Sequence, residues 1–135
     1  MLDGRGVAVD QSAAALLKLR RDYPRVAAVR ADATALPFRD GSFERYFAAH
    51  LYGLLQTDDR SRLMEEARRV AAEVVILDAG RPDGVAAAEW QDRSLPDGGR
   101  YRIYRRHFEA GVLALEIDGT VLFDGSLYVL VASGA

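Results

Sequence analysis

The chain of 135 residues contains no cysteine, which excludes disulfides, thiolate metal sites and cysteine nucleophiles together. Only two histidines are present, His50 and His107, and neither lies at helical spacing from carboxylates, so no metal site is expected. The sequence also lacks a run of apolar residues long enough to cross a bilayer and a basic-then-apolar leader at its start. We therefore expect a cytoplasmic protein with no membrane partner.

Neither sign of charge dominates the sequence. Eighteen Lys and Arg residues stand against twenty Asp and Glu residues, a net charge of -2, which argues against a general nucleic-acid partner. Half of the residues are apolar and 28% are charged, as in ordinary globular proteins. The length predicts a single domain over residues 1–135, with one core and no room for a second substrate domain.

Short apolar runs alternate with helical patterns along most of the chain. Strands are predicted at residues 7–9, 26–29, 43–49 and 74–77, with helices from Ser12 to Tyr23 and from Thr57 or Asp58 to about residue 70. This alternation is typical of an α/β protein with a parallel sheet. A polar stretch follows at 81–106, then a short helix at 108–117 and an antiparallel hairpin whose strands are 120–123 and 127–132.

From Val7 onward the chain resembles the class I S-adenosylmethionine-dependent methyltransferases. The likeness rests on Val-Ala-Val-Asp-Gln-Ser around Asp10, Ala-Asp-Ala-Thr-Ala-Leu-Pro-Phe at 31–38, Asp-Gly-Ser-Phe at 40–43, Glu-Ala-Arg-Arg-Val at 66–70, and the terminal hairpin. The resemblance implies a three-layer, Rossmann-like sheet that is mostly parallel with an antiparallel C-terminal hairpin. It also implies S-adenosylmethionine as the cofactor.

The same resemblance implies where the methyl donor binds. Asp10 would receive the ribose hydroxyls and Asp32 the adenine amino group, because a carboxylate at the carboxyl end of a parallel strand accepts hydrogen bonds from such groups. The expected cofactor-binding residues are Asp10, Gln11, Asp32, Ala33, through its backbone N–H, and Leu36. The structural alternatives are a helix cap for Asp10, an Asx turn for Asp32 and a plain core position for Leu36.

The methyl acceptor would meet residues that follow the later strands. His50 and Tyr52 are the catalytic candidates, since methyl transfer needs a base only for some acceptors; the alternative is a satisfied, half-buried histidine. Arg100, Arg102, Tyr104 and Arg106 are the substrate candidates, because alternate side chains of a strand there would reach a small anionic molecule. A solvated edge or lid with locally neutralised arginines is the alternative.

One departure from the family is the absence of the first strand and its glycine-rich loop ahead of Val7. Residues 1–6 are expected to be the end of a helix and its turn, because a parallel crossover needs about a dozen residues. Either the strands at 7–9 and 43–49 pair directly, or another chain fills the gap in a homodimer.

Three functions remain open, the third weaker than the other two. The first is a small-molecule methyltransferase, and the second is a truncated remnant or pseudoenzyme of that family that does not bind the methyl donor. A dehydrogenase-type nucleotide domain fits less well, because its glycine-rich loop would stand about 20 residues before the acidic residue.

Overall fold

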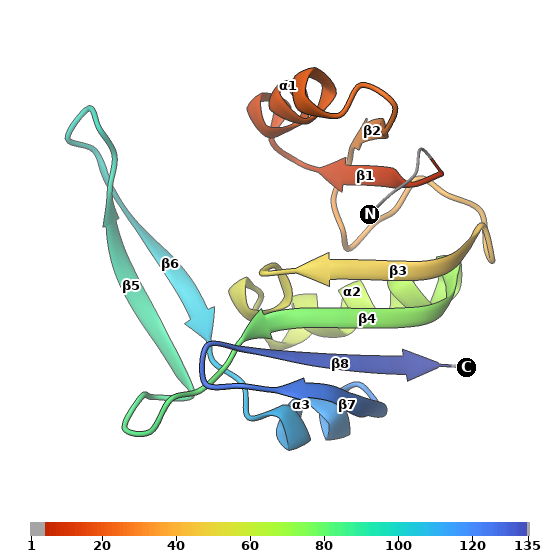
Figure 1. Ribbon diagram of the computed structural model, residues 1–135. Coiled ribbons are helices and arrows are strands. Elements are labelled where there is room, and N and C mark those ends of the chain that lie inside the picture. The colour runs from red at the N-terminus through yellow and green to blue at the C-terminus, as the bar shows by residue number, and fades with distance from the viewer. Residues whose placement is uncertain (1–4, 135) are drawn as a thin grey trace. The chain divides into compact units, whose positions relative to one another are not determined.

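The computed structural model describes residues 5–134, so residues 1–4, within the segment expected to end a helix, lie outside the described part. The chain divides into two compact units, one ending at Phe38 and the other beginning at Arg39. Figure 1 labels the helices and strands of both. The single domain expected from the length stays a prediction.

The first unit is a strand, a helix and a parallel strand, as the sequence predicts. β1 (Val7–Asp10) pairs with β2 (Ala27–Arg30) in register from Val7 opposite Ala27, and α1 (Ala13–Asp22) connects them. The hydroxyl of Ser12 caps the helix by accepting from the N–H of Ala15 at 3.2 Å. The predicted elements are confirmed here, with β2 beginning one residue later than expected.

The second unit contains a four-stranded sheet in the order β3-β4-β8-β7. Its strands are β3 (Phe43–Ala49), β4 (Ala71–Ala79), β7 (Gly119–Asp124) and β8 (Tyr128–Gly134). β3 and β4 are parallel, and β8 is antiparallel to both β4 and β7. The predicted terminal hairpin is confirmed, and its second strand rather than its first lies beside β4 (Figure 1).

Two helices build the core of this unit. α2 (Thr57–Val70) packs against β3 and β4, and α3 (Ala110–Glu116) packs against β7 and β8. Apart from Phe108 and the polar Asp78, the side chains that are at most 1% exposed alternate along the strands and recur at helical spacing: Leu63, Ala67, Val70, Val74, Ile76, Leu113, Ile117, Val129 and Val131. Each large aliphatic side chain buried in this way stabilises the fold by roughly 1.5–3 kcal/mol. This core therefore fixes the carboxyl ends of β3 and β4, where candidate site residues of this unit lie.

The stretch at 81–106 requires a correction. It was expected to be polar chain with at most one strand at 100–106, but it forms an antiparallel hairpin of β5 (Ala88–Ser94) and β6 (Arg100–Arg106). We call this hairpin the arm; Figure 1 shows it extending away from the four-stranded sheet. β5 carries too few apolar residues to give a buried-strand pattern, and its partner strand stabilises it instead.

The two strands that the sequence left as possible neighbours, β1 and β3, belong to different sheets, and β1 pairs with β2. A homodimer stays a prediction. In the part of the chain that the structure describes, no helix is both long and apolar enough to cross a membrane.

Candidate functional site

Asp10 ends β1 and enters the turn that leads to α1. Its Oδ1 accepts a hydrogen bond from the N–H of Ser12 at 2.8 Å, and the residue is exposed. The alternative of a helix cap at Asp10 is therefore wrong, because the N-cap of α1 is Ser12 and Asp10 accepts a bond from that residue instead. A carboxylate offers about four acceptor positions, so this one bond leaves Asp10 able to accept from a ligand as well.

Asp32 follows β2 and forms the predicted Asx turn. Its Oδ1 accepts from the backbone N–H of Thr34 at 2.8 Å and from the Thr34 hydroxyl at 2.7 Å. These bonds lower the pKa of Asp32, so the exposed side chain stays a carboxylate and acts as an acceptor. Local structure and ligand binding are thus compatible at this position.

The other predicted cofactor residues flank these two carboxylates. The carbonyl of Gln11 accepts from Nε of Arg30 at 2.8 Å, which joins the ends of β1 and β2. Ala33 is half-buried, and Leu36 is buried, as a core residue would be. The carboxyl ends of two parallel strands therefore present polar atoms together, which is where open α/β sheets bind ligands.

His50 stands at the carboxyl end of β3 in the second unit. Its backbone N–H donates to the carbonyl of Leu77 at 2.9 Å, and its φ of 55° is left-handed. The side chain is exposed, so the alternative of a half-buried histidine is wrong. A non-glycine residue in this conformation marks a backbone held by its surroundings, here by the pairing of β3 with β4.

Tyr52 belongs to the short 3-10 helix η1 (Tyr52–Leu54) and is buried, with 2% of its surface exposed. Its hydroxyl donates to Oε1 of Glu116 at 2.8 Å. Burial, reinforced by this carboxylate, raises the pKa of Tyr52, which keeps the hydroxyl protonated. This geometry favours a positioning role over a catalytic one for Tyr52.

Glu116 is the centre of a polar network that the sequence analysis missed. Its Oε1 also accepts from Nε of Arg60 at 2.7 Å, and its Oε2 lies 3.5 Å from Nη2 of Arg106. Burial alone would raise the pKa of Glu116, but the bonds from Arg60 and Tyr52 outweigh it and lower the pKa. The network ties α2, η1, α3 and the base of the arm together.

Asp78, near the carboxyl end of β4, was also missed. It is fully buried; its Oδ2 accepts from the N–H of Gly53 at 2.7 Å and its Oδ1 from that of Ala79 at 2.7 Å. Nη1 of Arg105 lies 3.8 Å from Oδ1. The signal was available, because Asp78 directly follows the apolar run at 74–77 as Asp10 follows the one at 7–9.

The four predicted substrate residues share one face of β6, since they alternate along the strand. Arg102 pairs with Asp92 at 3.3 Å and lies over the ring of Trp90, 5.6 Å from its centroid. Tyr104 meets Trp90 edge-on, with 5.6 Å between the ring centroids. Arg100 is exposed near the tip of the arm. The alternative of locally neutralised arginines holds for Arg102 and fits Arg106, at the base of the arm, less well.

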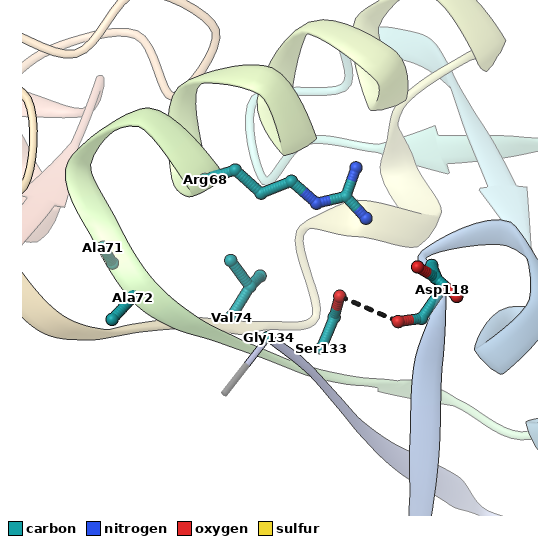
Figure 2. A pocket seen from close by; sticks show the side chains of 7 residues that line it. All are labelled: Arg68, Ala71, Ala72, Val74, Asp118, Ser133 and Gly134. Atoms are coloured by element: carbon teal, nitrogen blue, oxygen red, sulfur yellow. Dashed lines mark hydrogen bonds between the residues drawn. The ribbon is translucent and has the colours of Figure 1, made fainter.

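Two surface hollows lie away from these residues. Figure 2 shows one of about 310 Å³ at the start of β4, lined by Arg68, Ala71, Ala72, Val74, Asp118, Ser133 and Gly134. Its polar groups are already engaged: Arg68 donates to the carbonyl of Ile117 at 2.6 Å, and Ser133 to that of Asp118 at 3.1 Å. The other, of about 430 Å³, lies between Arg81 and the β7–β8 turn. None of the sequence-predicted site residues lines either hollow.

Among residues 5–134 no cluster of three or more His, Asp or Glu side chains is arranged to hold a metal ion.

Comparison with protein families matches residues 2–73 to a family described as a methyltransferase domain, which is more than half of the chain. The chain therefore belongs to this methyltransferase family. No curated protein matches it in sequence.

Solved structures agree on the fold. DhpI, in a complex with SAM and HEP, superposes with a TM-score of 0.75 at 19% identity over 93% of this chain and 66% of its own. A protein from Pyrococcus horikoshii gives 0.71 at 17% identity, covering 96% of this chain and 70% of that one. A SAM-dependent methyltransferase from Methanosarcina mazei gives 0.71 at 13% identity, with 95% and 80% covered.

The fold is thus the Rossmann-like α/β fold of class I S-adenosylmethionine-dependent methyltransferases, as the sequence resemblance implied. The chain spans less than two thirds of the length of DhpI, with which it shares this fold.

Proposed function

We propose that this chain is a methyltransferase that uses S-adenosylmethionine and transfers its methyl group to a small anionic molecule. The observation that carries the proposal is the exposed carboxylate of Asp10 at the carboxyl end of β1, in a chain of the methyltransferase family. DhpI has been solved with SAM and HEP and with SAH, which supports the same choice of cofactor for this fold.

The residues of the first unit fit the adenosine end of the cofactor. Asp10 retains acceptor positions for two vicinal hydroxyls, and Asp32 is an ionised acceptor suited to an amino group. Gln11 and Ala33 supply polar backbone atoms beside them, and Leu36 an apolar side chain. The cofactor, when bound, would supply a methyl group on a sulfonium, and the leaving group would be a neutral thioether that needs no acid from the protein.

The second unit would hold the acceptor. His50 is exposed at the carboxyl end of β3 and would orient the acceptor or take its proton. Tyr52 would position η1 through Glu116, and the arginines of β6 would attract a negatively charged acceptor. Alignment of the two substrates accounts for most of the rate in such a displacement.

Isothermal calorimetry with S-adenosylhomocysteine tests the proposal directly. Saturable binding to the chain that weakens in Asp10→Asn supports it. If wild type and variant both fail to bind, the chain is instead a member of the family that does not bind the methyl donor. Binding that Asp10→Asn leaves unchanged would remove Asp10 from the site.

A further inference from the structure

Trp90 is the single tryptophan of the chain, and it lies half-exposed on the arm, with 51% of its surface accessible. It pairs in register with Tyr104, and Ala88 pairs with Arg106 one step nearer the base of the arm. Because side chains two residues apart share a face of a strand, Trp90, Tyr104 and Arg106 form one continuous surface. An aromatic platform beside a guanidinium is the composition of a recognition surface rather than of a solvated edge.

Positive charge on this face is in excess at the base of the arm. Glu116 is shared by two guanidinium groups, those of Arg60 at 2.7 Å and Arg106 at 3.5 Å. Within residues 5–134, Nε of Arg106 is buried and has no hydrogen-bond partner. A buried donor without a partner is unfavourable, and the side chain of Arg106 is one quarter exposed, so a ligand approaches its guanidinium from the exposed side.

The other arginines of the arm are less suited to hold an anion. Arg102 is matched by Asp92, and Arg105 lies near the buried Asp78. Arg100 is exposed near the tip, where water and salt screen its charge. The small side chain of Ala88, opposite Arg106, leaves the base of this face uncrowded.

We propose that the base of the arm binds an aryl oxyanion, with its charged group on Arg106 and its ring against Trp90 and Tyr104. This inference rests on the proposed function in one respect, because it takes the aryl oxyanion to be the methyl acceptor. Nε of Arg106 is buried and Nη2 faces Glu116, so an oxyanion reaches this guanidinium through Nη1, on the quarter of the side chain that is exposed.

Trp90 makes the binding visible, since all tryptophan fluorescence comes from this surface. We expect benzoate to change the fluorescence with a saturable response at roughly millimolar concentration, at constant ionic strength. Acetate, which has the charge without the ring, and benzyl alcohol, which has the ring without the charge, should bind at least about ten-fold more weakly. Equal responses to acetate and benzoate would overturn the aryl class, and no saturable response to benzoate would overturn the site.

Substitutions test whether the guanidinium of Arg106 is the group that binds the carboxylate of benzoate. Arg106→Gln should weaken benzoate at least about ten-fold, and Arg106→Lys should restore only part of the affinity because it loses the planar donor set. Arg93→Gln is the matched control: it also removes one positive charge from the arm, but from the opposite face, where Arg93 pairs with Tyr101. Equal losses in Arg106→Gln and Arg93→Gln would show general attraction to the arm and overturn the site.

Separate measurements follow the stability of the fold and the binding of S-adenosylhomocysteine. In Arg106→Gln, Glu116 keeps its bonds from Arg60 and Tyr52, so the urea midpoint should stay near that of wild type. If that midpoint falls, Arg106→Lys carries the test. Calorimetry with S-adenosylhomocysteine on the same samples separates the two proposals. If the chain binds benzoate but not S-adenosylhomocysteine, the proposed function alone is refuted. If it binds S-adenosylhomocysteine but not benzoate, the aryl oxyanion site alone is refuted.

Discussion

The backbone N–H of Gly53 donates to Oδ2 of Asp78 at 2.7 Å, across 25 positions of sequence. This bond joins the turn that follows β3 to the carboxyl end of β4, so it fixes η1 beside the base of the arm. The carboxylate is fully buried, and bonds from backbone N–H groups stabilise it there.

Gly53→Ala should disrupt this arrangement. A Cβ at this position would lie 2.8 Å from the carbonyl oxygen of Arg106 and 2.8 Å from Oδ1 of Asp78, so the backbone must move. We expect a loss of roughly 1–3 kcal/mol in the free energy of unfolding, measured by urea denaturation. Gly111→Ala is the control, because a Cβ there meets open space on α3 and should be neutral or stabilising by up to about 1 kcal/mol. Equal effects of the two substitutions would contradict the close packing of Gly53.

The network at Glu116 predicts a ranking of stabilities. Tyr52→Phe removes one hydrogen bond to Glu116 and should cost about 1 kcal/mol. Arg60→Ala should cost more, roughly 3 kcal/mol, because it removes a buried side chain with three hydrogen-bond partners and leaves Glu116 short of its main one. Chemical denaturation at pH 7 measures both, and a smaller loss in Arg60→Ala than in Tyr52→Phe would contradict the network.

The same carboxyl group predicts a pH dependence. The pKa of Glu116 is lowered from its ordinary value of 4.5, so its contribution to stability is full above that value and is lost as the pH falls through the lower, folded-state pKa. We expect the free energy of unfolding to decline more steeply below pH 4.5 in wild type than in Glu116→Gln. The two stability curves should converge in acid. A constant difference between them from pH 7 into acid would contradict the lowered pKa.

Substitutions at Asp10 and Ser12 distinguish ligand binding from helix capping. Asp10→Ala should weaken S-adenosylhomocysteine about ten-fold or more, since hydrogen bonds to a charged group contribute about 1.5–3 kcal/mol. Ser12→Ala removes the N-cap of α1 and should cost about 1 kcal/mol of stability with little change in that affinity. Calorimetry and thermal melts on both variants check this. Equal affinity losses would mean that Asp10 acts only through the start of the helix.

Local patterns were sufficient for much of the fold. β1, α1, β3 and α2 lie where the sequence predicts them, because a strand or a helix displays its period over a few neighbouring residues. Ser12 as a cap and the Asx turn at Asp32 follow from chemistry within three residues. The family likeness was carried by these same local segments.

Only the tertiary structure determined the order of the sheet, the arm and the buried polar groups. The Tyr52–Glu116 and Arg60–Glu116 bonds join residues 64 and 56 positions apart. A local sequence pattern cannot predict hydrogen-bond partners at such separations. β5 is stabilised by pairing with β6 rather than by an apolar period of its own. The physical reason is the same in each case: a buried charge or an unpatterned strand is stable only with a partner, and the folded chain decides which residue that partner is.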